Sequence, residues 1–190
     1  MAIGKSKMGE IINETGLSKA IVGKYLSVLA DLDIIERRVP ATEKHPHKSR
    51  KGLYKLKDNF YKFWFSFIFP NIEEIEKGKG EELASKRIIP SLNRYASSIF
   101  EDICKQFLWK TTDYEKIGSW WHKENEIDIV ALKNEEILFG ECKWKDGVDA
   151  EKVLMDLMEK SKSVTCSKRK YAIFAKSFKS KKIKNVLLFD

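Results

Sequence analysis

The stretch EIDIVALKNEEILFGECKW, residues 126–144, decides the fold of the C-terminal half of the chain. Apolar residues run on either side of a short polar segment, which predicts two β-strands joined as a hairpin. We expect the turn to centre on Asn134 and Glu135. A four-residue loop in the same register fits equally well, because Asn-Glu is not a favoured two-residue turn.

Charged side chains interrupt this hairpin. With the expected turn, Asp128 lies opposite Glu141 and Glu126 lies opposite Lys143, and strand alternation puts these side chains on one shared face. Two opposed carboxylates destabilise a hairpin unless something offsets their repulsion. A divalent cation would do so, since Mg²⁺ (or Mn²⁺) binds carboxylate oxygens. The alternative is a cross-strand Glu126–Lys143 ion pair, with the other two carboxylates facing solvent.

The segments that flank the hairpin complete an α/β domain. Hydrophobic spacing predicts helices at 92–108 and 150–163, and alternation predicts further strands at 116–121, 171–176 and 186–189. With the two hairpin strands, this gives an α-β-β-β-α-β order, followed by a last strand at 186–189. We therefore expect a central mixed sheet covered by helices.

The N-terminal region predicts a smaller module. Residues 7–38 have the spacing of a helix-turn-helix, in which Gly16 ends the first helix and Ser18 caps the second. Two short strands, with the basic segment EKHPHKSRK between them, would make it a winged helix. Because only residues 1–6 precede its first helix, the winged helix would be truncated. A small helical dimerisation or docking module is the alternative.

The second helix of this module has two expected faces. The inward face is expected to hold Val22, Tyr25, Leu26 and Leu29. The outward face near its start would meet DNA, because the second helix of a helix-turn-helix enters the major groove. The residues expected to contact DNA, in this helix and in the basic segment, are Lys19, Lys24, Ser27, Lys48, Arg50 and Lys51.

An aromatic segment separates the two modules. NFYKFWFSFIF, residues 59–69, is expected to form a helix that Asp58 caps and that ends before Pro70. Its aromatic residues cover nearly every face, so we expect the helix to be buried between the modules. A polar, glycine-containing connector follows. The expected domains are a winged helix at 1–57, the aromatic packing helix and connector at 58–87, and the α/β domain at 88–190.

Net charge limits the class of partner. The 190 residues carry a net charge of +8, which favours an anionic partner. The run FWFSFIF at 63–69 is too short to cross a bilayer, so nucleic acid is a better candidate than a membrane. Cys104, Cys142 and Cys166 lack metal-ligand spacing and fit a reducing cytoplasm. The basic segment 160–184 would contact phosphates or form a solvated tail.

Three short motifs of the C-terminal half resemble a known superfamily. FE at 100–101, EID at 126–128 and ECK at 141–143 are similar to the motifs of restriction-endonuclease-like PD-(D/E)XK nucleases, over about residues 90–190. The proline of the PD motif is absent. The chain as a whole is similar to the C-terminal part of archaeal AAA-type ATPases, in which a winged helix precedes a nuclease-like domain. The stretches that carry this second resemblance are GKYLSVLADLDIIERRVP, YKLKDNFYKFWFSFIFPN and IGSWWHKENEIDIVAL.

The resemblance implies a role for each site residue. Asp128 and Glu141 would hold Mg²⁺ (or Mn²⁺), with the backbone carbonyl of Cys142 as a further ligand. Lys143 would assist the attacking water and stabilise charge that develops on the phosphate. The remaining site residues are Glu101, which would bind a metal-bound water or a second ion, and Lys160, which would touch a phosphate.

Two functions follow from these patterns. The first is a Mg²⁺-dependent DNA endonuclease coupled to a winged-helix DNA reader. The second is a non-catalytic DNA-binding and docking region of a larger AAA-type ATPase, with the nuclease fold as a scaffold. A protein–protein adaptor that binds no nucleic acid is a third. The chain has no G-x-x-x-x-G-K-[ST] motif, so an ATPase domain would act in cis or in trans. A homodimer would suit an enzyme that cuts both strands.

Overall fold

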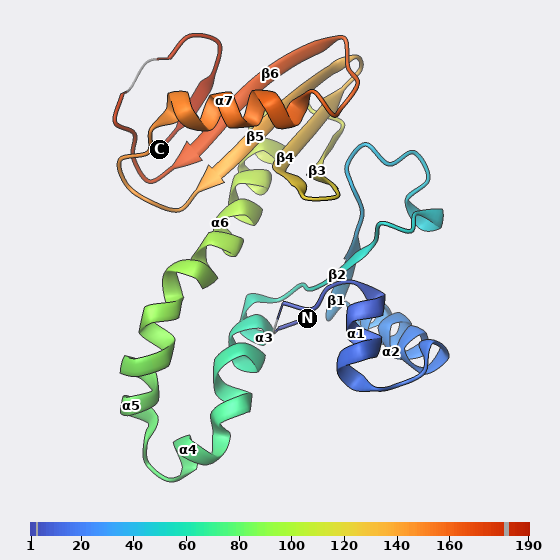
Figure 1. Ribbon diagram of the computed structural model, residues 1–190, viewed down its shortest axis with the longest axis vertical. Helices are drawn as coiled ribbons and strands as arrows, with labels where there is room; N and C mark the ends of the chain where they lie inside the picture. The colour runs from blue at the N-terminus through green and yellow to red at the C-terminus, as the bar shows by residue number, and fades with distance from the viewer. Residues whose placement is uncertain (3, 181–182) are drawn as a thin grey trace. The chain divides into compact units, whose positions relative to one another are not determined.

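The computed structural model describes residues 1–2, 4–180 and 183–190. They form two compact units (Figure 1). Unit 1 comprises Met1–Val39 and His45–Leu92, and unit 2 comprises Pro40–Lys44 and Asn93–Asp190. Within the described residues, no helix has the length and apolar character needed to cross a membrane.

Unit 1 begins with two helices joined by a short turn. Helix α1 (Met8–Thr15) ends at Gly16, which adopts a left-handed φ of 67°. Ser18 caps helix α2 (Lys19–Asp31) by accepting a hydrogen bond from the backbone N–H of Ile21. The expected roles of Gly16 and Ser18 are therefore confirmed.

A small core lies between α2 and a two-stranded antiparallel sheet of β1 (Ile35–Arg38) and β2 (Leu53–Leu56). Val22 and Leu26 of α2 are buried in this core. Tyr25 was expected beside them, but it is 60% exposed, so that expectation is wrong. Its position on α2 lies at the edge of the buried stripe, and a large side chain there turns to solvent.

One arginine holds the basic loop, residues 45–51, that joins the two strands. Its tip is the 3₁₀ turn η1 (Pro46–Lys48). Arg37 of β1 donates hydrogen bonds to the backbone carbonyls of Pro46, at 2.9 Å, and Ser49. Gly52 leaves room for this guanidinium, because a Cβ there would lie 2.5 Å from the Nε of Arg37. The loop is thus a structured projection of β1 and β2.

Helical turns fill most of residues 59–92, as Figure 1 shows. Asp58 caps them as expected, accepting a hydrogen bond from the Phe60 amide at 2.6 Å. Pro70 lies in the first turn of a 3₁₀ helix, where its missing N–H costs little, so the helical path continues past it. Gly78, with a φ of 77°, then reverses the chain. The elements are α3 (Asn59–Phe63), the π-helix η2 (Trp64–Ile68), the 3₁₀ helix η3 (Phe69–Asn71), α4 (Ile72–Glu76), α5 (Gly80–Leu83), the π-helix η4 (Ala84–Ile88) and α6 (Ile89–Thr111).

The aromatic side chains of α3, η2 and η3 are not buried, although their number had predicted a buried helix. None of the residues in these three elements is buried, and Phe60 and Phe69 are 63% and 58% exposed. Neighbouring rings contact one another along the helix instead. The centroids of Phe65 and Phe69, for example, lie 5.6 Å apart. Aromatic content alone did not determine which faces would be covered.

Unit 2 contains a five-stranded mixed sheet in the order β3-β4-β5-β6-β7. The pairs β3/β4 and β4/β5 are antiparallel, and β5/β6 and β6/β7 are parallel. The mixed α/β fold expected from the sequence is confirmed, and each expected helix and strand is present. The elements are β3 (Lys116–His122), β4 (Asn125–Lys133), β5 (Glu136–Lys143), α7 (Ala150–Ser161), β6 (Lys168–Ala175) and β7 (Leu187–Phe189).

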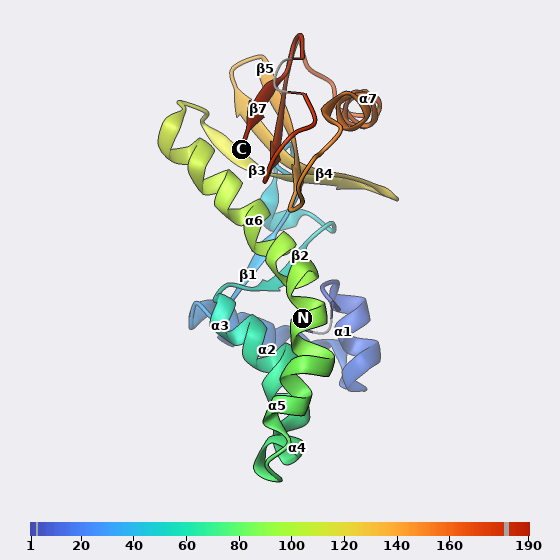
Figure 2. The same ribbon diagram turned by 90° about the vertical axis from the view of Figure 1, so that its left-hand side faces the viewer.

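The hairpin β4–β5 supplies the centre of two cores on opposite faces of the sheet. Val130 and Phe139 pack with Leu157 of α7, whereas Leu138 packs with Leu108 of α6. Figure 2 shows α7 and the end of α6 on either side of the strands. Because helices cover both faces, the middle of each hairpin strand is buried.

The turn of the hairpin has the expected register. Val130 pairs with Phe139 and Lys133 pairs with Glu136, so the turn contains two residues. Asn134 supplies the left-handed conformation that this tight turn needs, with a φ of 51°. Asparagine tolerates that conformation better than most side chains, which explains why an unfavoured turn sequence is accepted here.

Replacing Gly140 with alanine should destabilise unit 2 by about 1–3 kcal/mol. The added Cβ would lie 2.9 Å from the branched Cβ of Ile129 on the neighbouring strand. Gly80→Ala is the matched control, because an added methyl group there meets nothing within 4 Å. Urea unfolding followed by far-UV circular dichroism measures both. Equal stability of the two variants would contradict the close strand contact.

Candidate functional site

A β-bulge lies in the middle of β4. Gly118 of β3 pairs with Val130, but Trp120 pairs with Ile127, so two steps along β3 match three along β4. The backbone carbonyl of Ser119, opposite the extra residue, accepts a hydrogen bond from the Ala41 amide at 2.8 Å instead. The bulge therefore breaks the regular alternation of β4: Ile127 packs in the same core as Val130, although the two are three positions apart, whereas Ile129 packs with Ala131 on the other face.

Asp128 is one of the residues that the bulge redirects. The observed β4–β5 pairing ends at Ile129 and Gly140, one step before the expected Asp128–Glu141 pair. Instead, Oδ2 of Asp128 accepts a hydrogen bond from the Cys142 amide at 2.8 Å. The expectation of direct Asp128–Glu141 opposition on one shared face is therefore wrong, because a regular alternation does not survive the bulge.

The expected Glu126–Lys143 pair is also not formed. Glu126 is exposed and pairs along the backbone with Trp121 of β3. The Nζ of Lys143 turns instead to Oε1 of Glu141, at 2.6 Å. The bulge again explains the difference, since it moves Glu126 away from the end of β5.

Glu141 is a buried carboxylate held between two lysines. Only 6% of the residue is exposed. Oε1 accepts a hydrogen bond from Lys143, and Oε2 lies 3.5 Å from the Nζ of Lys160 on α7. Oε2 itself is fully buried and accepts no hydrogen bond. A buried carboxylate is costly unless it is paired, and the two ammonium groups offset the cost of burying Glu141.

Asp128 has a strongly altered acidity. Burial, followed by the negative charges of Glu141 and Glu101, raises its pKa to about 7, and the hydrogen bond from Cys142 only partly opposes this. Burial by itself would lower the pKa of Lys143. The hydrogen bond and the negative charge of Glu141 outweigh this effect and raise the pKa. Lys143 is therefore a cation at neutral pH and is unsuited to act as a general base.

Glu101 joins the site from α6. Its charge is near enough to raise the pKa of both Asp128 and Cys142. One turn further along α6, the Cys104 thiol contacts Cys142, and this hydrogen bond together with burial raises the pKa of Cys142 far above its usual range. These two thiols thus pack α6 against β5, and the raised pKa makes Cys142 a poor nucleophile. We call Glu101, Asp128 and Glu141 the carboxylate cluster.

The carboxylate cluster fits a hard divalent cation in its chemistry. Its charges repel one another, and one buried carboxylate oxygen lacks a hydrogen bond. Oxygen donors of this kind suit Mg²⁺ or Mn²⁺. In the part of the chain that the structure describes, no three His, Cys, Asp or Glu side chains already converge as a metal centre. A cation would therefore have to draw on Asp128, Glu141 and the Cys142 carbonyl.

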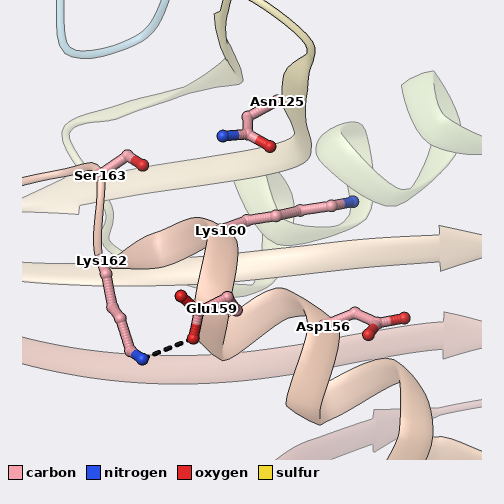
Figure 3. A pocket seen from close by; sticks show the side chains of 6 residues that line it. All are labelled: Asn125, Asp156, Glu159, Lys160, Lys162 and Ser163. Carbon is pink, nitrogen blue, oxygen red and sulfur yellow. Dashed lines mark hydrogen bonds and ion pairs between the residues drawn. The ribbon is translucent and has the colours of Figure 1, made fainter.

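A polar pocket of about 470 Å³ borders the site through Lys160. Figure 3 shows Lys160 extending from the end of α7 toward the start of β4, where Asn125 lies. Glu159 pairs with Lys162 beside it, at 2.5 Å. Two acids and two lysines line the pocket, so it carries no excess positive charge. The lining residues are Asn125, Asp156, Glu159, Lys160, Lys162 and Ser163.

Apart from Lys160, the residues expected to contact DNA lie on unit 1, whereas the carboxylate cluster lies on unit 2. Lys19, Lys24 and Ser27 are exposed on α2. Lys48 and Arg50 are exposed in the basic loop. Lys51, next to them, is exposed as well. The expectation that these six residues contact DNA stays a prediction.

The basic segment 160–184 is only partly a solvated tail. Lys168 and Lys170 pair with Glu136, at 2.9 and 2.8 Å, and hold the pKa of Glu136 below its usual range. Arg169 donates a hydrogen bond to the Val164 carbonyl at 2.9 Å. Lys181 and Lys182, which belong to the same expectation, lie outside the described residues.

An aromatic pair lies beside the carboxylate cluster. Trp144 follows β5, and its ring centroid lies 5.1 Å from that of Phe100, the neighbour of Glu101. The Nζ of Lys176 sits 4.4 Å from the centroid of the Trp144 ring. Lys176 therefore brings a cation close to the end of β5, and no short motif in the sequence could have indicated it.

Comparison with known proteins gives one family. A family model described as "Archaea bacterial proteins of unknown function" matches residues 64–161. The chain is 38% identical, over its full length, to "Uncharacterized protein MJECL04" of Methanocaldococcus jannaschii, of which it spans 45%. The crystal structure of protein VC1899 from Vibrio cholerae aligns with this chain at 13% sequence identity and a TM-score of 0.30. The alignment covers 86% of this chain and 35% of the VC1899 chain.

Asp128→Asn should stabilise the protein at high pH only. A carboxyl whose pKa is raised by folding costs stability as pH rises from about 4 to about 7, because the unfolded chain ionises first. In EDTA, the variant should match wild type near pH 4 and exceed its free energy of unfolding by about 4 kcal/mol above pH 7. Urea titrations across this range test it, with the exposed Asp156→Asn as control. A pH-independent difference would refute the buried charge repulsion.

Proposed function

The chain belongs to the DUF234 family of archaeal and bacterial proteins of unknown function. For this member of the family, we propose that it binds DNA and hydrolyses its phosphodiester bonds in a Mg²⁺-dependent reaction. The observation that carries this proposal is the buried Glu141, held between Lys143 and Lys160 beside Asp128, whose pKa is raised to about 7. A buried acid beside a lysine and a second acid is what the resemblance to PD-(D/E)XK nucleases leads us to expect of such a site. The resemblance of the sequence motifs supports the same activity.

The energetics of the carboxylate cluster favour a functional role over a structural one. Burial of Asp128, together with the charges of Glu141 and Glu101, raises its pKa to about 7, which costs stability at neutral pH. Apolar side chains at these positions would extend the two cores without that cost. Strongly perturbed carboxylates cluster at catalytic and binding sites for this reason.

Each residue of the cluster has a distinct task in this proposal. Asp128 and Glu141, with the Cys142 carbonyl, would hold the cation, and Glu101 would bind water beside it. The cation would supply a Lewis acid for the phosphate and lower the pKa of its bound water. Lys143, charged at neutral pH, would orient that water and stabilise charge on the phosphate. Lys160 would release Glu141 to reach a phosphate oxygen.

DNA is the proposed substrate because of the net charge of +8 and the form of the basic loop. Arg37 fixes that loop as a projection that carries Lys48 and Arg50 into solvent. Phosphate contacts from such a loop give affinity without sequence preference. The loop would therefore hold DNA for the cluster to cut.

A non-catalytic DNA-binding and docking region of a larger AAA-type ATPase is the second candidate. One observation favours it: both oxygens of Glu141 already face lysines, and Asp128 already binds the Cys142 amide, so the site is partly satisfied without a cation. The chain spans less than half of its longer relative, so a further domain in cis would be consistent with this role. In this case the cluster would serve as an ion-pair bridge between α7 and β5.

Plasmid nicking separates the two candidates. In Mg²⁺ or Mn²⁺ the wild type should nick supercoiled DNA, and Glu141→Gln and Lys143→Met should each reduce the rate about 100-fold or more. Lys145→Met is the matched control, since Lys145 is exposed two residues beyond Lys143. Circular dichroism would verify that all variants fold.

Two outcomes would reject the enzyme. One is nicking that persists in Glu141→Gln, which would indicate a contaminating nuclease. The other is a wild type that shifts DNA on a gel but never cuts it with either metal. That second result supports the docking region.

Substituting the basic loop should weaken DNA binding without changing the fold. In a Lys48→Ala, Arg50→Ala, Lys51→Ala variant, the slope of log affinity against log salt should fall by about 3, one unit for each phosphate contact. Fluorescence anisotropy with labelled duplex measures this slope. The control removes the same charge from α4 to η4, as Lys77→Ala, Lys79→Ala, Lys86→Ala. Equal loss in both variants would show that net charge, not the loop, binds DNA.

A further inference from the structure

Helix α2 has a second apolar stripe beside the one that packs into its own core. Four large apolar residues of this stripe are exposed although Val22 and Leu26 already anchor the helix to unit 1. A single exposed apolar residue is ordinary, but a continuous stripe on one helix marks an interaction surface. We call these residues the apolar seam: Ile21 (44% exposed), Tyr25 (60%), Val28 (45%) and Leu32 (63%).

The spacing of the apolar seam is that of a paired helix. Its residues follow one another at steps of four, three and four, which is the alternation of the two apolar positions in a heptad. Such a seam keeps its residues along one line of the helix, where they meet the same line of a partner helix. A surface that reads the edges of DNA bases requires polar groups, so the apolar seam does not suit the major groove.

We propose that α2 pairs antiparallel with α2 of a second copy of this chain, across a two-fold axis. In an antiparallel pair the seam closes on itself, since Tyr25 meets Val28 of the partner subunit and Ile21 meets Leu32 of the partner subunit. Four apolar layers result, and no seam residue is left without a partner. A two-fold interface uses the same patch on both copies, as this arrangement does.

Charge complementarity supports the antiparallel direction. Lys24 precedes Tyr25 and Asp31 precedes Leu32, so both flank the seam on the same side, and both are exposed. Among the described residues, neither forms an ion pair. In the antiparallel pair, Lys24 lies next to Asp31 of the partner subunit, and the contact occurs twice. A parallel pair would instead set Lys24 beside Leu29 of the partner subunit, which fills its own core.

This inference goes beyond the proposed function and does not depend on it. It uses Lys24, which would then pair with the second copy, and leaves Lys19, Ser27 and the basic loop free for DNA. Dimerisation is measured without DNA or metal. Loss of nicking and loss of dimerisation are therefore separate results.

Sedimentation velocity of the intact chain tests the pair. At concentrations up to about 200 μM the wild type should form a dimer, because a short helical seam supports affinity in the micromolar range. Val28→Glu should yield a monomer at every concentration. Ala30→Glu, which is exposed on α2 but off the seam, should leave the dimer intact. Circular dichroism of the monomeric variant verifies that unit 1 still folds.

A charge exchange tests the direction of the helices. Lys24→Glu should weaken the dimer about 10-fold or more, because it places two pairs of acids together. Adding Asp31→Lys to it should restore the affinity of the wild type. A monomeric wild type would overturn the proposal and leave the apolar seam to a different protein segment. A dimer that survives Val28→Glu, or a double variant that stays weak, would also overturn it.

Discussion

Glu141 is a buried carboxylate side chain at the end of a strand, and Lys143 and Lys160 offset the cost of its burial from two directions. Lys143 comes from the same strand, whereas Lys160 comes from α7. The pair therefore couples the carboxylate to the packing of α7 on the sheet. Removing either lysine leaves an uncompensated buried charge, and removing the carboxylate leaves two unpaired ammonium groups. The position and the charge of the whole carboxylate cluster therefore depend on the pairing of Glu141 with these two lysines.

The bulge in β4 is the second constraint on the site. A regular strand would place Asp128 directly opposite Glu141, where the two charges repel most strongly. The extra residue turns Asp128 toward the Cys142 amide and toward Glu101 on α6. Burial, followed by the negative charges of Glu141 and Glu101, still raises the pKa of Asp128 to about 7. Bulges near active sites serve to redirect a side chain in this way. The Ala41 amide, by bonding to the Ser119 carbonyl, stabilises the irregular strand.

The two units divide the tasks that we propose. Unit 2 carries the carboxylate cluster on a rigid hairpin, where packing on both faces holds the reacting groups in place. Unit 1 carries the basic loop and the apolar seam on a much smaller core. A small core cannot cover every apolar face of its helices. The uncovered faces of α2 and of the aromatic helical turns are where unit 1 is available to partners.

The sequence by itself determined the hairpin, its turn and the order of strands and helices, since these follow from local alternation, spacing and capping that neighbouring residues impose. It also brought Asp128, Glu141 and Lys143 together as candidates, because all three lie on one hairpin. Only the tertiary structure decided the bulge, the pairing of Lys160 with Glu141 and the exposure of Tyr25 and Phe69. Each of these depends on which distant backbone or helix lies alongside, and a pattern of residue types does not specify that.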